Sequence, residues 1–222
     1  MKGRLIVIEG TDCSGKETQS KLLVGYLNEK GINAIRFAFP DYNSPTGKII
    51  AGPYLGKSGY LPPLFEEGSV NVDPYCACLL YAMDRKYNIQ KIVDKLNEGY
   101  IVVLDRYVES NMAFQGARLD DDKREHLFDF IDKLEYQMLE LPRPDQTLFL
   151  YMPSWATKKL KEKRAEAPDQ NEKDEEYLLR AEKVYLQLAI KYGWTTVDCV
   201  EKDNILSPEK IANVIKEKIN IK

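Results

Sequence analysis

Residues 4–18, RLIVIEGTDCSGKET, decide the fold of this chain. The aliphatic run at 5–8 predicts a buried strand, and the positions after it carry the pattern GxxxxGK at Gly10, Gly15 and Lys16. An amphipathic segment follows. A buried strand, a glycine-containing loop and a helix in this order are typical of a phosphate-binding loop.

This loop has the chemistry that a polyphosphate requires. Glycines let the backbone curl so that several N–H groups point inward, and the next helix presents its positive end to the same place. Lys16 adds a full positive charge directed at the outer phosphates. We therefore expect the donor nucleotide to bind at Gly10, Thr11, Asp12, Cys13, Ser14, Gly15, Lys16, Glu17 and Thr18.

One position departs from the usual motif. A Ser or Thr normally follows the lysine and binds Mg²⁺ through its hydroxyl, but here Glu17 follows and Thr18 lies one place late. Thr18 points about 100° further around the helix, so it does not replace that hydroxyl. Two alternatives remain. Either Glu17 turns outward and water fills the metal site, which we favour, or Glu17 binds Mg²⁺ itself.

Composition limits the class of protein. The 222 residues fit one α/β domain, and a net charge of −3 argues against a nucleic-acid polymer as the main partner. No apolar run approaches the ~18 residues of a membrane span, and we expect no signal peptide. The four cysteines lack the spacing of a zinc site, and His126 is the only histidine. We therefore expect free thiols in a reducing cytoplasm, and neither zinc chemistry nor a Ser-His-Asp hydrolase.

Hydrophobic periodicity predicts alternating strands and helices. Strands are expected at 5–8, 33–39, 100–104, 146–151 and 195–200, and helices at 19–30, near 47–55, and at 74–99, 108–115, 121–140, 174–192 and from 208 onward. The apolar positions of the 74–99 helix, Leu79 and Met83 among them, are expected on its buried side. The expected fold is a single α/β domain over residues 1–222, a three-layer α/β/α fold of the P-loop NTPase type with a five-stranded parallel sheet.

In an open parallel sheet the ligand lies outside the carboxyl ends of the strands. Asp105 follows the third strand and is placed to hold Mg²⁺ directly or through water. Arg106 offers a planar fork of donors for a second phosphate. A structural ion pair at the strand end is the alternative interpretation of these two residues.

A base-binding slot is predicted beside these phosphate groups. Tyr81 and Arg85 are four residues apart on one helical face, so the ring can stack on a base while the guanidinium bonds to its edge. Phe39 and Phe114 would complete an apolar slot, although Tyr81 can also be a core residue. Two phosphate sites and a base slot predict transfer of a phosphoryl group from ATP to a nucleotide.

Four stretches together resemble the thymidylate kinase family: IEGTDCSGKETQSKLL at 8–23, Phe39 with Pro40, LLYAMDR at 79–85 and DRYVESNMAFQGA at 105–117. The last is the most specific, because few other P-loop kinases carry it. The resemblance covers nearly the whole chain. It implies the reaction ATP + dTMP → ADP + dTDP with Mg²⁺, a place in dTTP biosynthesis and a homodimer built by helix packing.

The resemblance also implies roles for individual residues. Lys16 would hold the β- and γ-phosphates of ATP, Asp12 would contact the sugar 3′-hydroxyl or a lid arginine, and Arg106 would grip the acceptor phosphate. The implied nucleoside contacts are Phe39 and Pro40 as pocket boundary, Tyr81 stacked on thymine, Arg85 at its O4, Ser110 and Gln115 near base and sugar, and Phe114 as a wall.

Members of the family place a catalytic arginine either in the phosphate loop or in a lid, which we expect here at about 154–176. Cys13 takes the loop position, and residues 169–172 carry no arginine. Arg164 is therefore the expected lid arginine, assisted by Lys161 or Lys163, unless the basic run 158–164 is only a solvated helix face. The expected catalytic residues are Lys16, Asp12, Arg106 and Arg164.

Two rival functions remain open. One is a kinase for another nucleotide or for a deoxynucleoside, although Tyr81 and Phe114 leave little room for a purine. The other is a nucleotide-binding protein with weak catalysis, which the altered loop and the absent loop arginine favour. A GTPase switch is disfavoured because no NKxD motif follows the fourth strand.

Overall fold

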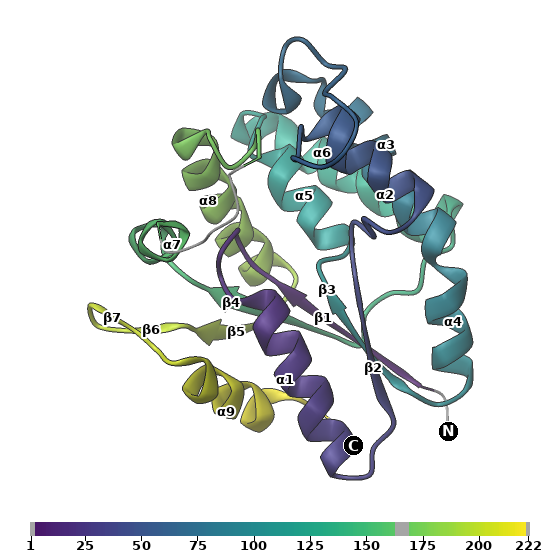
Figure 1. Cartoon of the computed structure of the whole chain (residues 1–222), viewed down its shortest axis with the longest axis vertical. Helices are drawn as coiled ribbons and strands as arrows, with labels where there is room; N and C mark the ends of the chain where they lie inside the picture. The colour runs from purple at the N-terminus through teal and green to yellow at the C-terminus, as the bar shows by residue number, and fades with distance from the viewer. Residues whose placement is uncertain (1–2, 163–168, 221–222) are drawn as a thin grey trace.

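The computed structural model describes residues 3–162 and 169–220. In this part of the chain one parallel sheet is formed by β1 (Arg4–Glu9), β2 (Ala34–Ala38), β3 (Ile101–Asp105), β4 (Gln146–Tyr151) and β5 (Thr195–Asp198). The strand order is β2-β3-β1-β4-β5, so β1 is central (Figure 1). The predicted parallel sheet of five strands is confirmed.

Helices account for most of the remaining chain. The longer ones are α1 (Lys16–Glu29), α3 (Pro74–Asn88), α4 (Gln90–Asn97), α5 (Val108–Gly116), α6 (Asp121–Asp132), α7 (Ser154–Lys161), α8 (Glu175–Lys191) and α9 (Pro208–Lys218). Shorter elements are α2 (Pro45–Ile49), the π-helices η1 (Ile50–Tyr54) and η3 (Lys133–Met138), the 3₁₀ turn η2 (Ser69–Asn71) and the hairpin β6 (Val200–Glu201) and β7 (Asn204–Ile205).

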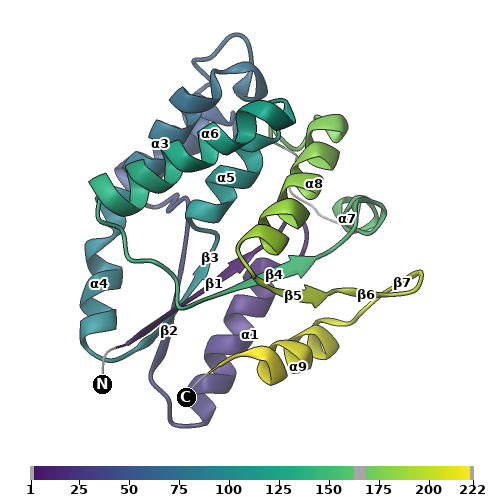
Figure 2. The ribbon, with the colours of Figure 1, turned by 180° about the vertical axis from the view of Figure 1, so that it is seen from behind.

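Both faces of the sheet are buried under helices. Leu5 and Val7 of β1 belong to the apolar core under α3, α4, α5, α6 and α8. Ile6 and Ile8, the alternate residues, belong to the core under α1 and α9 on the opposite face (Figures 1 and 2). This alternation is the two-residue period of a strand, and the two cores confirm the predicted three-layer fold.

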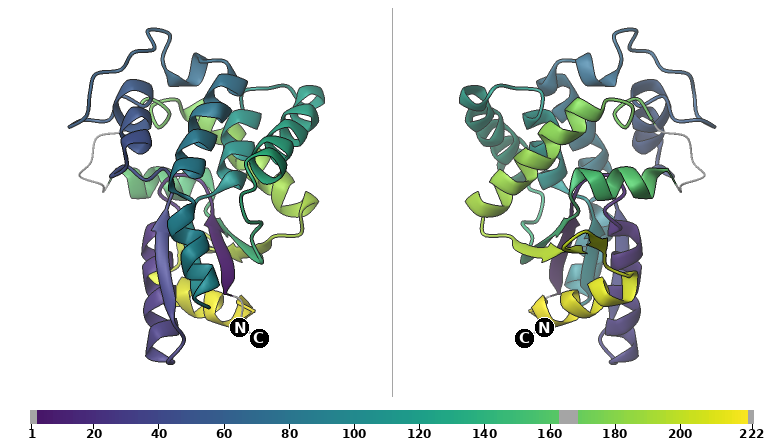
Figure 3. Two further views of the ribbon diagram at one scale, coloured as in Figure 1. Left: turned by 90° about the vertical axis from the view of Figure 1, so that its right-hand side faces the viewer. Right: turned by 90° about the vertical axis from the view of Figure 1, so that its left-hand side faces the viewer.

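The strand register brings the predicted site together. Ile8 of β1 and Ala38 of β2 both lie level with Asp105, the last residue of β3. The phosphate loop, Phe39 and Arg106 therefore begin at the same end of the sheet. In Figure 3, α3, α5, α6 and α8 gather in the upper half of the molecule, while α1 and α9 lie in the lower half.

The prediction of one helix over residues 74–99, with Leu79 and Met83 buried, is wrong in two respects. It consists of α3 and α4, with Ile89 between them. Leu79 and Met83, predicted to be buried, are 50% and 39% exposed. The buried side chains of α3 are small or polar instead. Arg85 lines the cavity, and Asp84 and Asn88 bond to Ser44 and Thr46. The full buried set is Ala77, Cys78, Ala82, Asp84, Arg85 and Asn88.

Several other boundaries also differ from the prediction. The helix expected at 121–140 ends as α6 and continues as the π-helix η3, and the one expected near 47–55 is α2 followed by η1. The last strand stops at Asp198, and the chain then forms the β6–β7 hairpin. Periodicity placed these segments, but it did not predict where the helical hydrogen bonding changes.

Glu109 of α5 is a buried carboxyl group away from the predicted site. Tyr136 donates a hydrogen bond to its Oε1 at 2.8 Å. Its Oε2 is buried without a hydrogen-bond partner among the residues that the structure describes. Burial, together with the nearby charge of Glu9, raises the pKa of Glu109 from 4.5 to about 7. The folded protein therefore keeps this proton at pH values where the unfolded chain has lost it.

We expect Glu109→Gln to stabilise the protein in a pH-dependent way. Well below pH 4.5 the raised pKa does not change the free energy of unfolding, because Glu109 is protonated in both states. Between pH 4.5 and about 7 only the unfolded chain loses the proton, so the free energy of unfolding falls, by on the order of 3 kcal/mol once the pH is above 7. The gain in the free energy of unfolding should therefore be small at pH 5 and largest at pH 8, as measured by urea denaturation. Glu98→Gln, which changes an exposed carboxylate paired with Lys95, is the control. A gain that does not change with pH would contradict the prediction.

Candidate active site

The loop between β1 and α1 has the backbone shape of a phosphate cradle. Gly10 and Gly15 have positive φ angles of 153° and 87°. A Cβ atom on Gly10 would lie 2.7 Å from Oγ of Ser14, so a larger residue does not fit there. Helix α1 begins at Lys16, directly after Gly15, and its free N–H groups face the loop. The sequence prediction of a phosphate loop therefore agrees with the observed backbone.

Lys16 lies inside this loop. Its Nζ donates to the carbonyl oxygen of Thr11 at 2.6 Å and lies 3.4 Å from Oγ of Ser14. Burial, and then the charge of Arg106, lower the pKa of Lys16 to about 8, while Asp12 opposes the shift. The ammonium group is thus largely desolvated in the folded protein, and an anionic phosphate beside it would raise the pKa again.

Glu17 points out of the loop. Its Oε1 accepts a hydrogen bond from Nζ of Lys21 at 2.6 Å, and its side chain is 66% exposed. Thr18 is exposed as well. The structure thus has Glu17 in the outward orientation, which is the first of the two alternatives drawn from the sequence.

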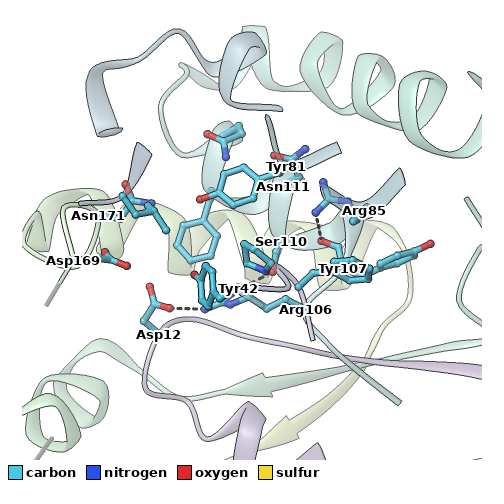
Figure 4. Close-up of a pocket in the computed structure, with 15 residues that line it drawn as sticks. Asp12, Tyr42, Tyr81, Arg85, Arg106, Tyr107, Ser110, Asn111, Asp169 and Asn171 are labelled. Atoms are coloured by element: carbon cyan, nitrogen blue, oxygen red, sulfur yellow. Dashed lines mark hydrogen bonds and ion pairs between the residues drawn. The ribbon is translucent and has the colours of Figure 1, made fainter. Parts of the chain in front are cut away.

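A cavity that Asp12 of the loop helps to line adjoins the loop (Figure 4). In Figure 4 the rings of Tyr42 and Tyr81 point into this space. The cavity brings together every residue predicted to bind the acceptor nucleotide, and these are Phe39, Pro40, Tyr81, Arg85, Arg106, Ser110, Phe114 and Gln115.

Arg106 lies between the loop and the cavity. Its backbone is left-handed, with φ of 65°. Nη1 donates to the carbonyl oxygen of Gly10 at 3.0 Å, and Nη2 donates to the carboxylate of Asp12. Burial acts to raise the pKa of Asp12, but the charges of Arg106 and Lys16 hold it below its ordinary value. Asp12 is therefore ionised and fixes the guanidinium of Arg106.

Glu9 is a site residue that the sequence reasoning missed. It is fully buried, and its Oε1 accepts hydrogen bonds from the backbone N–H groups of Tyr107 at 2.8 Å and Ser110 at 3.1 Å. Its Oε2 accepts from Oγ of Ser110 at 2.6 Å and from Oη of Tyr185 at 3.0 Å. Burial raises the pKa of Glu9, although the nearby Arg106 opposes this. A carboxylate at the end of an apolar strand was the available signal.

The base end of the cavity contains a second buried ion pair. Arg85 on α3 donates to both carboxylate oxygens of Glu135. The amide of Asn111 donates to the same carboxylate at 2.9 Å. The sequence reasoning found Arg85 but missed Asn111 and Glu135. Asn111 lies within the stretch DRYVESNMAFQGA at 105–117, whereas nothing in the local pattern distinguishes Glu135 from an exposed helix residue.

Asp105, the predicted metal ligand, lies at the end of β3 below Arg106. Its Oδ2 accepts a hydrogen bond from Nη2 of Arg36 at 2.7 Å. Within residues 3–162 and 169–220, no three His, Cys, Asp or Glu side chains are grouped in a way that could hold a metal ion. Mg²⁺ in kinases typically takes one or two carboxylates together with phosphate oxygens and water. The single carboxylate of Asp105 fits that mode, and its metal role stays a prediction.

The segment predicted as a lid is described only in part, since Lys163 and Arg164 lie outside the described residues. Before the gap, Nζ of Lys161 donates to the carbonyl oxygen of Glu172 at 2.9 Å. Beyond it, Asp169 and Asn171 line the cavity. Lys57 pairs with Asp169 at 3.2 Å, and Ser69 donates to Asn171 at 2.7 Å. The residues after the gap therefore contact the loop that precedes α3.

A central phosphate loop on a parallel sheet, next to a second pocket with an arginine at its border, defines a P-loop nucleotide kinase. The family model for thymidylate kinase matches residues 8–207. The thymidylate kinase of Mycobacterium tuberculosis is 32% identical over 86% of this chain and 87% of its own length. The human thymidylate kinase is 32% identical over 68% of this chain and 62% of its own length.

A solved structure of thymidylate kinase from Candida albicans superposes with a TM-score of 0.72 at 27% identity, covering 97% of this chain and 90% of that chain. The chain belongs to the thymidylate kinase family. The predicted family, the P-loop fold and the class of ATP-dependent nucleoside monophosphate kinase are confirmed.

We expect Tyr185→Phe to weaken binding of the acceptor nucleotide. The change removes a donor to Glu9 and an acceptor that lies 3.2 Å from Nη1 of Arg106, so Arg106 loses part of its orientation. KM for the acceptor should rise roughly three- to tenfold, with a loss of stability of about 1 kcal/mol.

Tyr177→Phe is the matched control for this variant. Tyr177 is also a buried tyrosine of α8, but its hydroxyl donates to the carbonyl oxygen of Phe114 and not to the Glu9 network. Steady-state kinetics and thermal unfolding of both variants check the prediction. Equal changes in KM for the two variants would contradict it.

Proposed function

We propose that this protein transfers the γ-phosphoryl group of ATP to dTMP, giving ADP and dTDP, as the first of the two phosphorylations that lead to dTTP. The observation that carries this proposal is the position of Arg106. Its guanidinium bonds to the phosphate loop at Gly10 and to Asp12, and it also borders the acceptor cavity. A donor phosphate and an acceptor phosphate would therefore meet beside one fixed cation.

The residues divide between the two nucleotides. Lys16 and the loop backbone would hold the β- and γ-phosphates of ATP, and Arg106 would bind the phosphate of dTMP, held in place by Asp12. A phosphate monoester is already an adequate nucleophile, so catalysis consists of alignment and charge stabilisation. No covalent intermediate with the protein is needed.

The nucleoside would occupy the aromatic part of the cavity. Tyr81 would stack on thymine, with Phe39 and Phe114 as walls. Arg85 would donate to O4 of the base. Tyr81 packs edge-on against Tyr54, with the ring centroids 5.8 Å apart, so the stacking face is supported from behind. Ser110 and Gln115 would lie near the base and sugar.

We further propose that Asp105 holds Mg²⁺, directly or through water. The ion would neutralise negative charge on the phosphates during transfer. The outward orientation of Glu17 supports a metal site without it, because its carboxylate already pairs with Lys21. Arg164, in the proposed lid at about 154–176, would supply the remaining positive charge.

A homodimer is the proposed assembly. Leu79, Met83 and Tyr87 recur every four residues on the outer face of α3 and are 50%, 39% and 61% exposed. An apolar stripe of this kind on a helix fits helix–helix packing between two subunits.

The proposed location is the reducing cytoplasm. None of the four cysteines, all of which lie within the described residues, forms a disulfide, which suits that compartment. No helix within residues 3–162 and 169–220 is both long enough and apolar enough to cross a membrane.

Coupled ADP release with dTMP tests the function. We expect Lys16→Ala and Arg106→Ala each to lower kcat/KM by at least about a hundredfold, because each removes a cation that stabilises developing charge. Lys30→Ala, at the far end of α1, is the control and should keep full activity. A panel of dTMP, dUMP, dCMP, dGMP and nucleosides tests the acceptor. The proposal is wrong if dTMP is not phosphorylated.

Glu17→Ser tests the metal site. Replacing the outward carboxylate with the usual hydroxyl should raise activity or lower the Mg²⁺ concentration needed for half-maximal rate, since the hydroxyl can bind the ion. Titration of Mg²⁺ at fixed ATP and dTMP measures this. Lys21→Ala, which removes only the pairing partner of Glu17, is the control. A large loss of activity in Glu17→Ser would instead indicate that Glu17 binds Mg²⁺ directly.

A further inference from the structure

The buried carboxylate of Glu135 reaches the base end of the cavity from outside the phosphate machinery. It lies in the π-helix η3 and is 0% exposed. A π-turn rotates the side chains after it relative to an α-helix, and such turns occur frequently at functional sites. Glu135 touches neither Lys16 nor Arg106, so a role in phosphate binding does not explain its burial.

The contacts of Glu135 join two side chains that line the cavity. Its Oε1 accepts hydrogen bonds from Nη2 of Arg85 at 2.5 Å and from Nδ2 of Asn111 at 2.9 Å. Its Oε2 accepts from Nε of Arg85. One edge of the Arg85 guanidinium is therefore held by a bidentate ion pair, and both cavity residues take their orientation from one carboxylate.

The amide of Asn111 has only one possible orientation in this setting. Its Nδ2 faces the carboxylate of Glu135 and also the carbonyl oxygen of Cys78 at 3.2 Å. Neither oxygen can donate a hydrogen bond, so the NH₂ group must lie on that side. The opposite atom, Oδ1, is buried and has no hydrogen-bond partner within the described part of the chain.

An orphaned buried oxygen is costly, so a ligand that donates a hydrogen bond to it is favoured. Asn111 and Arg85 both line the cavity. Among the residues that the structure describes, Nη1 of Arg85 has only a long contact, 3.4 Å, to the carbonyl oxygen of Tyr107. Two side chains that line the cavity thus carry a buried acceptor without a partner among the described residues, Oδ1 of Asn111, and a donor with a long contact, Nη1 of Arg85.

This pair matches one kind of pyrimidine edge. Thymine and uracil carry an N3–H donor next to the O4 acceptor, whereas cytosine carries an N3 acceptor next to an N4 amino donor. We propose that Glu135 is the positioning residue that makes the site select a 4-oxo pyrimidine over cytosine, because it fixes both Asn111 and Arg85 in the matching orientation. The inference rests on dTMP being the acceptor.

Loss of the Glu135 carboxylate removes the contact that fixes the side chains of Arg85 and Asn111. In Glu135→Gln, the new NH₂ group faces Asn111 or Arg85, which are both donors at this point. Only the 3.2 Å contact to the carbonyl oxygen of Cys78 then holds the amide of Asn111, so the amide turns more readily and presents Nδ2 to the cavity, where it suits N3 of cytosine. The preference for dTMP over dCMP should therefore fall, while the preference between dTMP and dUMP, which share the same edge, should not change.

Steady-state kinetics of wild type and Glu135→Gln with dTMP, dUMP and dCMP test the inference. We expect KM for dTMP and dUMP to rise about tenfold or more, with kcat changed less than about threefold, because the phosphate groups are untouched. The dTMP-to-dCMP ratio of kcat/KM should fall by a similar factor. A structural role alone would lower kcat/KM for all three nucleotides alike and leave the ratio unchanged, which would overturn the inference.

Two further variants keep the test decisive. Glu125→Gln removes a carboxylate from the surface of α6, where it pairs with Lys191, and should behave as wild type. If Glu135→Gln does not fold, Glu135→Asp takes its place, since it keeps the charge but withdraws it from both partners. A wild type that phosphorylates dCMP as well as dTMP also overturns the inference. A wild type without dTMP turnover instead overturns the proposed function.

Discussion

The guanidinium of Arg106 is the element on which both halves of the site depend. The backbone N–H of Arg106 donates to the carbonyl oxygen of Ile8 at 3.1 Å, so this residue is bonded to β1 although it follows β3. From there the side chain reaches Gly10 and Asp12 of the phosphate loop. This is possible only because β1 and β3 are neighbours in the sheet. The strand order therefore places the phosphate loop and the cavity beside one guanidinium group.

Buried charges of opposite sign arrange the rest of the site. Glu9, Asp12, Lys16 and Arg106 lie within one network at the phosphate end, and Glu135 with Arg85 lies at the base end. Ion pairs of this kind add little net stability, because desolvation offsets their attraction, but removal of one partner leaves an unpaired buried charge. Their effect is to hold long side chains in one orientation, which phosphoryl transfer and base recognition both require.

The helix α3 shows where apolar periodicity fails as a guide to packing. Apolar periodicity indicates the face of a helix that avoids water, and it wrongly placed Leu79 and Met83 in the core. The inner face of α3 carries polar residues for two reasons: Arg85 lines the cavity, and Asp84 accepts hydrogen bonds from Ser44 and Thr46. The residues with recognisable chemistry, Tyr81 and Arg85, were nevertheless assigned to the cavity that they line.

The sequence by itself determined the phosphate loop, the parallel sheet and part of the cavity lining, but it did not predict that Tyr42, Asn111 and Asn171 also line the cavity. The predicted features follow from local backbone requirements, such as a glycine where a Cβ would clash, and from motifs whose members are close in sequence. Only the tertiary structure decided which charged atoms from distant parts of the sequence meet: Asp105 with Arg36, and Arg85 with Glu135. A local pattern records burial and spacing, whereas these pairings depend on the direction of long side chains and, for Glu135, on a π-turn.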